Sequence, residues 1–165
     1  MPEAGAELES TVSHEADDPR TIVAASVEYW RFFVQRLAGA SAVTSVEEIA
    51  TDWPMTVLSV ESVNPRAASI DLLVTPHELI LHLGRHGCRW ELDDGEVDTA
   101  FTERVIDAAI AGRAEELVGT IRFAVRVTFR DGTVEENVRL DGFLAPTRRW
   151  MRREPWTRFE PYDVE

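Results

Sequence analysis

GTIRFAVRVTFRDGTVEENVRL, residues 119–140, decides the fold of this 165-residue chain. Apolar side chains alternate with polar ones before Asp131-Gly132 and recur after it, which is the period-two pattern of two half-buried strands. Asp-Gly favours a two-residue turn with positive φ at both central positions. That turn pairs Val125 with Val138, so it predicts a long hairpin with one apolar face.

A three-residue loop with a bulge is the alternative turn at Asp131-Gly132. It shifts the pairing by one residue, and such a shift moves every side chain of the second strand to the other face. Val134, Val138 and Leu140 would then lie on the arginine face, so the sequence favours the tight turn. Arg122, Arg126 and Arg130 form this row of arginines. It is interpreted as a solvated face of the sheet, with anion binding as the open alternative.

The composition predicts one globular domain with an acidic surface. The chain is 44% hydrophobic and 28% charged, and its 17 arginines and no lysine stand against 30 acidic residues, for a formal net charge of -13. Such a surface repels nucleic acid and anionic membranes and attracts basic partners. We therefore predict another protein as the partner, no nucleic acid and no membrane, with a homodimer as an open alternative.

Cysteine usage indicates a reducing compartment. Cys88 is the single cysteine, so an intramolecular disulfide and four-cysteine zinc sites are excluded. The early residues lack a basic start followed by an apolar run, and no apolar stretch is long enough to span a membrane. The expected location is cytoplasmic. No dinucleotide, phosphate-loop or metalloprotease motif occurs, so no cofactor is predicted.

The sequence pattern divides the chain into two parts. Residues 1–18 are predicted to be an acidic mobile tail, because acids abound there and large apolar groups are few. Residues 19–165 are predicted to form a single α+β domain. It begins with a helix, since Asp18-Pro19 supplies a cap and a first helical residue, and Gly39 supplies a stop. The apolar stripe of this helix has helical spacing and comprises Val23, Val27, Trp30, Val34 and Leu37.

In the middle of the chain the hydrophobic pattern changes from helical spacing to the alternation of strands. Ser45 and Glu48 fit a capping box, which predicts a short second helix before Trp53-Pro54. Four short strands are predicted next, over residues 56–63, 68–74, 78–84 and 88–92. A two-residue turn at His86-Gly87 would pair Leu83 with Trp90 and would set His82 opposite Glu91. A helical stripe between Phe101 and Ile110 follows.

This order predicts an α+β fold. It has a largely antiparallel β-sheet, made of the meander plus the long hairpin, with the two main helices packed on one face. The order of elements resembles that of secretion chaperones and toxin-immunity proteins. The resemblance implies a role in binding another protein.

An enzyme would have its candidate site on the polar face of the meander. The candidate catalytic residues are His77, His82 and Glu91, and the candidate metal ligands are His77, His82 and His86. The spacing of these residues is equally that of an exposed His82–Glu91 cross-strand pair, which the sequence favours. No metal is therefore predicted. Cys88 shares a strand face with Trp90, which predicts a buried thiol that is not a nucleophile.

Basic and aromatic residues gather near the carboxyl end. The candidate binding residues there are Arg148, Arg149, Trp150, Arg152, Arg153 and Trp156. Arg and Trp are frequent in binding hot spots, but the same residues can pack against acidic surface of their own chain. The sequence thus predicts a non-catalytic cytoplasmic protein-binding module. The alternative is a small hydrolase-like or metal-dependent enzyme with a pocket near His77, His82 and Glu91.

Overall fold

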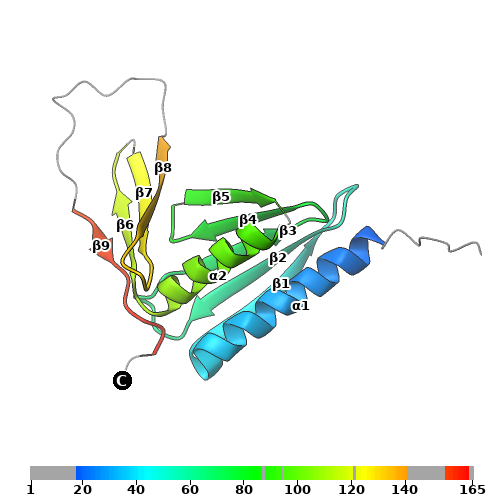
Figure 1. Ribbon diagram of the computed structural model, residues 1–165, viewed down its shortest axis with the longest axis horizontal. Coiled ribbons are helices and arrows are strands. Elements are labelled where there is room, and N and C mark those ends of the chain that lie inside the picture. Colours follow the sequence, from blue (N-terminus) through cyan, green and yellow to red (C-terminus); the bar gives the residue numbers. More distant parts are fainter. Residues whose placement is uncertain (1–17, 87, 94, 121, 141–154, 164–165) are drawn as a thin grey trace, which may run out of the picture.

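The computed structural model describes residues 18–86, 88–93, 95–120, 122–140 and 155–163 (Figure 1). The elements run in the order α1 (Pro19–Ala38), η1 (Gly39–Ser41), β1 (Ala42–Ile49), β2 (Met55–Ser62), β3 (Ile70–Val74), β4 (Glu78–Leu83), β5 (Cys88–Asp93), α2 (Glu96–Ile110), β6 (Ala114–Val118), β7 (Arg122–Thr128), β8 (Val134–Leu140) and β9 (Thr157–Arg158). No helix within these ranges is long and apolar enough to cross a membrane.

The strands form two antiparallel sheets, which confirms the predicted α+β class. The meander sheet has the strand order β1-β2-β3-β4-β5, and the hairpin sheet has the order β8-β7-β6-β9. Both helices lie on one side of the meander sheet, and the hairpin sheet stands beside its β5 end (Figure 1). The prediction of helices on one face is therefore confirmed, while the hairpin forms a sheet of its own.

Helix α1 forms where its sequence signals place it. The Asp18 carboxylate accepts a hydrogen bond from the Arg20 amide at 3.1 Å, and Pro19 occupies the first turn. The chain leaves the helix at Gly39, whose φ of 54° suits a residue without a Cβ atom. The predicted stripe is buried from Val23 to Val34. The capping signals thus predicted both ends of α1, and the periodicity predicted its inward face.

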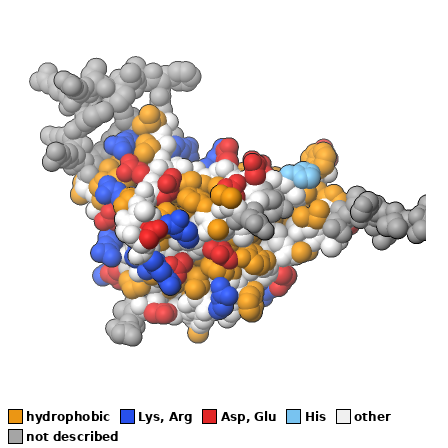
Figure 2. All heavy atoms as spheres, in the orientation of Figure 1, with side chains coloured by type: hydrophobic (Ala, Val, Ile, Leu, Met, Phe, Trp, Pro, Cys, Tyr) orange, Lys and Arg blue, Asp and Glu red, His pale blue; other side chains and the backbone are white. Residues whose placement is uncertain are grey.

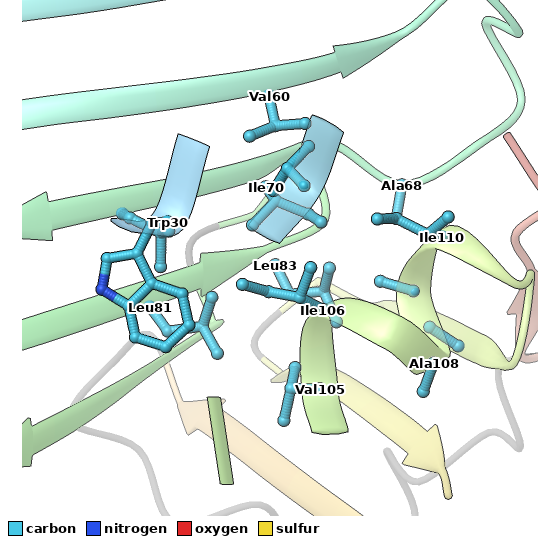
Figure 3. Packing of buried hydrophobic residues seen from close by; sticks show 14 of the residues in the cluster. Trp30, Val60, Ala68, Ile70, Leu81, Leu83, Val105, Ile106, Ala108 and Ile110 are labelled. Carbon is cyan, nitrogen blue, oxygen red and sulfur yellow. The ribbon is translucent and has the colours of Figure 1, made fainter. Parts of the chain in front are cut away.

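One hydrophobic core joins the helices to both sheets. Trp30 of α1 and Ile106 of α2 point toward Leu81 and the neighbouring strand residues of the meander sheet (Figure 3). The same cluster includes Val125 and Phe159 from the hairpin sheet side. Because the two sheets share this core, the described residues pack as one unit.

The predicted helix at residues 45–50 is wrong, because residues 45–49 belong to strand β1. Eight consecutive residue pairs join β1 to β2, from Ala42–Ser62 to Ile49–Met55. A helix of about six residues pays for nucleation without enough propagation to recover it. Val43, Thr44 and Val46 are β-branched and favour an extended chain, so pairing with β2 overrides the capping signal.

The predicted hairpin register is also wrong, and the alternative turn is the one observed. The Gly132 amide donates to the Phe129 carbonyl at 3.0 Å, and the Phe129 amide donates to the Thr133 carbonyl at 2.9 Å. This is a three-residue loop with a bulge, in which Gly132 takes the positive φ of 82°. Val138 therefore pairs with Ala124, and not with Val125.

The shifted register has a packing reason. On β8, the residues that share a face with buried Val125 and Val127 are Glu135 and Asn137. They do not enter the core, because this face of β8 meets the edge of β5, where the Asn137 side-chain amide donates to the Arg89 carbonyl at 2.7 Å. A polar inward face on β8 therefore suits an edge contact.

The turn between β4 and β5 is longer than predicted. Leu83 pairs with Cys88 and Leu81 with Trp90, two residues away from the predicted register. A shift of two residues keeps every side chain on its face. These four residues are consequently buried as expected, while His82 lies opposite Arg89 and not Glu91.

Candidate functional site

A groove separates the two helices on the covered face of the meander sheet. It has a volume of about 510 Å³ and lies between α1, the β3–β4 turn and the beginning of α2. Figure 2 shows this side of the molecule, where hydrophobic side chains gather among acidic and basic ones. A concave surface of this size is the usual location of a binding site.

The floor of the groove is apolar. Trp30, Val74 and Leu79 line it, and these residues are 3%, 2% and 8% exposed. Ala25 lies on the wall formed by α1 and is exposed to solvent. The floor of the groove is therefore formed by core residues that expose little of their surface.

Two acidic residues of adjacent strands contribute to the lining of the groove. Glu78 and Asp93 both line it, and they are directly opposite each other at the ends of β4 and β5. Like charges at such a cross-strand position destabilise a sheet by roughly 0.2 to 1 kcal/mol. No arginine or histidine of the described ranges forms an ion pair with either residue. The site carries an acidic charge that the described surroundings leave uncompensated.

A third carboxylate organises the same corner of the molecule. The Asp98 side chain accepts a hydrogen bond from the Asp93 amide at 2.8 Å. This contact ties the last residue of β5 to the first turn of α2, where negative charge is favourable. The backbone under the carboxylate of Asp93 is thereby held in place.

A hydrogen bond between the helices closes the other end of the groove. The Tyr29 hydroxyl of α1 donates to the Glu103 carboxylate of α2. This bond raises the pKa of Tyr29 above its ordinary value, with burial as a lesser cause, because the carboxylate favours the protonated phenol. Tyr29 lines the groove and Glu103 lines a second hollow, so the bond marks the boundary between them.

The second hollow, of about 410 Å³, is electrostatically different. It is lined by Arg104 and Asp131, which form an ion pair at 2.9 Å, and the Arg104 guanidinium lies 4.0 Å from the centre of the Phe129 ring. Asp107 lines it too and pairs with both Arg130 and Arg113. Four charged residues of this hollow are thus paired with one another or with Arg113, so the groove is the better candidate site.

The predicted enzyme residues are not brought together. His77 lies in the β3–β4 turn and His82 lies near the far end of β4, about 16 Å apart along the strand by the usual rise per residue. Glu91 forms an ion pair with Arg89 at 2.7 Å, and the His86 ring stacks on Phe123 at 5.2 Å. Across the described ranges, no three metal-ligating side chains form a cluster.

The Arg/Trp segment is described only in part. Arg148, Arg149, Trp150, Arg152 and Arg153 lie outside the described residues, so their role as binding residues stays a prediction. Trp156 is described, and the Arg126 guanidinium lies 4.0 Å from the centre of its ring. In the same segment the Arg158 side chain donates to the Gly112 carbonyl at 3.1 Å. These two residues make contacts within their own chain.

Cys88 has the properties expected of a core residue. It is 1% exposed, and burial raises the pKa of its thiol. A raised pKa leaves little thiolate near neutral pH, so the side chain is a poor nucleophile.

Sequence reasoning missed the groove for an identifiable reason. The predicted β4–β5 register placed Glu78 opposite Gly95, whereas the observed register places it opposite Asp93. The available signal in the sequence was the pair of glycines at positions 84 and 87, whose spacing allows more than a two-residue turn. Comparisons of the chain with protein-family models, curated proteins and solved structures found no match.

Proposed function

We propose that the protein is a non-catalytic binding module whose α1–α2 groove takes a basic, amphipathic segment of another polypeptide. The observation that carries the proposal is the combination of a buried apolar floor with the paired acidic residues Glu78 and Asp93 in the groove lining. An apolar side chain of the ligand would reach Trp30 and Leu79, while an Arg or Lys would compensate the two carboxylates.

The charge of the whole chain supports the same partner chemistry. A formal net charge of -13 attracts a basic segment at long range and opposes an acidic one. The lone buried Cys88 and the absence of a disulfide suit a cytoplasmic location. No described cluster supports the alternative of a metal-dependent enzyme, and no observation favours it over the binding module.

The groove can be blocked without touching the core. Ala25 is exposed and lines the groove, whereas neighbouring Ala24 is exposed on the same helix but does not line it. Successive helical residues point about 100° apart. The variants Ala25→Trp and Ala24→Trp therefore add the same side chain to the same helix, one inside the groove and one outside.

The probe is a labelled 14-residue peptide with leucines at helical spacing and arginines between them, followed by fluorescence anisotropy. We expect Ala25→Trp to weaken binding at least tenfold and Ala24→Trp to leave it unchanged. The paired variant Glu78→Gln with Asp93→Asn should weaken binding and reduce its dependence on salt. Circular dichroism checks that each variant is folded.

Two outcomes would overturn the proposal. Equal binding by the Ala25→Trp and Ala24→Trp proteins would show that the peptide does not use the groove. Equal binding of a peptide with glutamates in place of the arginines would show that the carboxylates do not select the ligand. A small organic amine that competes at the same site would instead identify the groove as a small-ligand site.

A further inference from the structure

Strand β1 is an edge strand of the meander sheet. Its eight residues pair with β2 along their whole length, and no described strand pairs with its other side. Six of the eight residues are exposed and the other two are half-buried. Val43 and Val46 are 58% and 47% exposed, so β1 presents apolar side chains as well as backbone.

The hydrogen-bonding pattern identifies which amides of β1 face outward. The Val63 amide donates to the Ser41 carbonyl at 3.0 Å, so this pair is hydrogen-bonded toward β2. Hydrogen-bonded and non-hydrogen-bonded pairs alternate in an antiparallel ladder. The N–H and C=O groups that point away from β2 are therefore those of Ala42, Thr44, Val46 and Glu48.

Most devices that protect an edge are missing from β1. The strand contains no proline, its pairing with β2 has no bulge, and eight residues exceed the usual length of a blunted edge. Its only charged residues are Glu47 and Glu48 near one end. A second copy would bring the same two carboxylates and a net charge of -13, whereas a basic segment would be attracted by them.

We propose that β1 is a second interaction surface, at which a basic, extended segment of another polypeptide adds as a sixth strand of the meander sheet. The backbone of the segment would bond to the four outward-facing residues. Its Arg or Lys side chains would lie at Glu47 and Glu48, and its apolar side chains against Val43 and Val46. This proposal is independent of the groove, because β1 contributes no residue to it.

The probe is the extended peptide Arg-Thr-Val-Arg-Val-Thr-Val-Arg, added to the full chain and followed by NMR hydrogen exchange and by fluorescence anisotropy. At saturation we expect the amides of Thr44 and Val46 to exchange at least tenfold more slowly. The amides of Val43 and Ser45 already face β2, so their exchange should change little. Such a pattern distinguishes strand addition from contact with side chains alone.

Two variants keep the test falsifiable. Val46→Pro removes an outward donor and spares the β2 ladder, so it should weaken probe binding at least tenfold in a folded protein. If Val46→Pro unfolds the chain, Glu47→Arg combined with Glu48→Arg gives the same loss through charge. Ala25→Trp, which blocks the groove, should bind this probe normally, so that the two proposals fail or hold separately.

Unchanged exchange at Thr44 and Val46 with the probe bound would overturn the inference. So would tight binding of the same peptide with glutamates in place of arginines. Sedimentation that shows a dimer, lost in the Val46→Pro protein, would assign the edge to a second copy of this chain and equally contradict a basic partner.

Discussion

The two edges of the meander sheet differ in which described elements pack against them. At β5, strand β8 lies against the edge, the Asn137 side chain donates to the Arg89 carbonyl, and Cys88 is buried. At β1, the structure places no described strand against the edge. As far as the described residues extend, one sheet thus carries a closed edge at β5 and an open edge at β1.

The closed edge uses polar residues where a core would use apolar ones. The Glu116 carboxylate, 5% exposed, accepts a hydrogen bond from the Arg85 amide at 2.9 Å and so fixes the β4–β5 turn to β6. Gly84 has a φ of 81°, and a Cβ atom there would lie 2.8 Å from the carboxylate. Closing a sheet edge needs such specific polar contacts, whereas leaving an edge open needs none.

The largest effect is expected from breaking the closed edge at its buried carboxylate. Glu116→Ala leaves the Arg85 amide without its acceptor and opens a cavity, which should lower the free energy of unfolding by about 3 kcal/mol. The same change at the open edge, Glu48→Ala, should alter it by less than about 0.5 kcal/mol. Urea unfolding measures both, and similar losses would contradict the assignment of the two edges.

The second prediction concerns the direction of the β1 amides. Ser45→Pro removes a donor to β2 and should lower the free energy of unfolding by about 2 kcal/mol. Val46→Pro removes a solvent-facing donor and should cost less than about 1 kcal/mol, because proline is tolerated at an open edge. If Val46→Pro loses more stability than Ser45→Pro in thermal or urea unfolding, the amide of Val46 points toward β2 and not toward solvent.

These two edges also explain what the sequence could predict. The stripe of α1 and the turn signals of the meander gave most elements and most buried residues, because periodicity reflects local burial. The capping box at Ser45 and Glu48 predicts a helix over residues 45–50, although pairing with β2 makes residues 45–49 a strand. The bulge at Gly132 was rejected because it exposed Val138, a cost that docking of Asn137 on β5 outweighs.

The candidate site was less predictable than the fold for a related reason. Glu78 and Asp93 lie fifteen positions apart, and their juxtaposition depends on the β4–β5 register. Beside this register Gly84 has a positive φ and the Arg85 amide donates to the buried Glu116 carboxylate. A long-range contact with β6 therefore helps to set the pairing of Glu78 with Asp93, and no local sequence pattern predicts that contact.

A smaller effect is expected from the hydrogen bond that joins β8 to β5. Asn137→Ala removes the donor to the Arg89 carbonyl and should lower the free energy of unfolding by about 1 kcal/mol. Glu135 lies on the same face of β8, and its side chain forms no hydrogen bond with the described residues, so Glu135→Ala serves as the control. Amides of β5 should exchange faster only in Asn137→Ala. Equal exchange in both variants would assign the closure to packing alone.

The smallest effect should be a pH dependence confined to the closed side of the sheet. One cross-strand row on the outer face runs from Ser45 and Ser59 at the open side to Asp71, His82 and Arg89 at the closed side. Burial lowers the pKa of His82; Arg89 and Arg139 lower it further, and Asp71 opposes them. The residue of this row with a lowered pKa, His82, therefore lies on the strand next to β5, and the row ends in serines at β1.

The sign follows from the lowered pKa of His82. In the unfolded chain a histidine binds its proton near pH 6.5, whereas folded His82 binds it only at lower pH. Its contribution to stability is therefore complete above pH 6.5 and is lost as the pH falls toward the folded pKa. The drop in unfolding free energy between pH 7.5 and pH 5.5 should be smaller in His82→Gln than in the parent, as measured by urea unfolding. A drop of equal size in both proteins would mean that the closed edge leaves His82 as solvated as a residue at the open one.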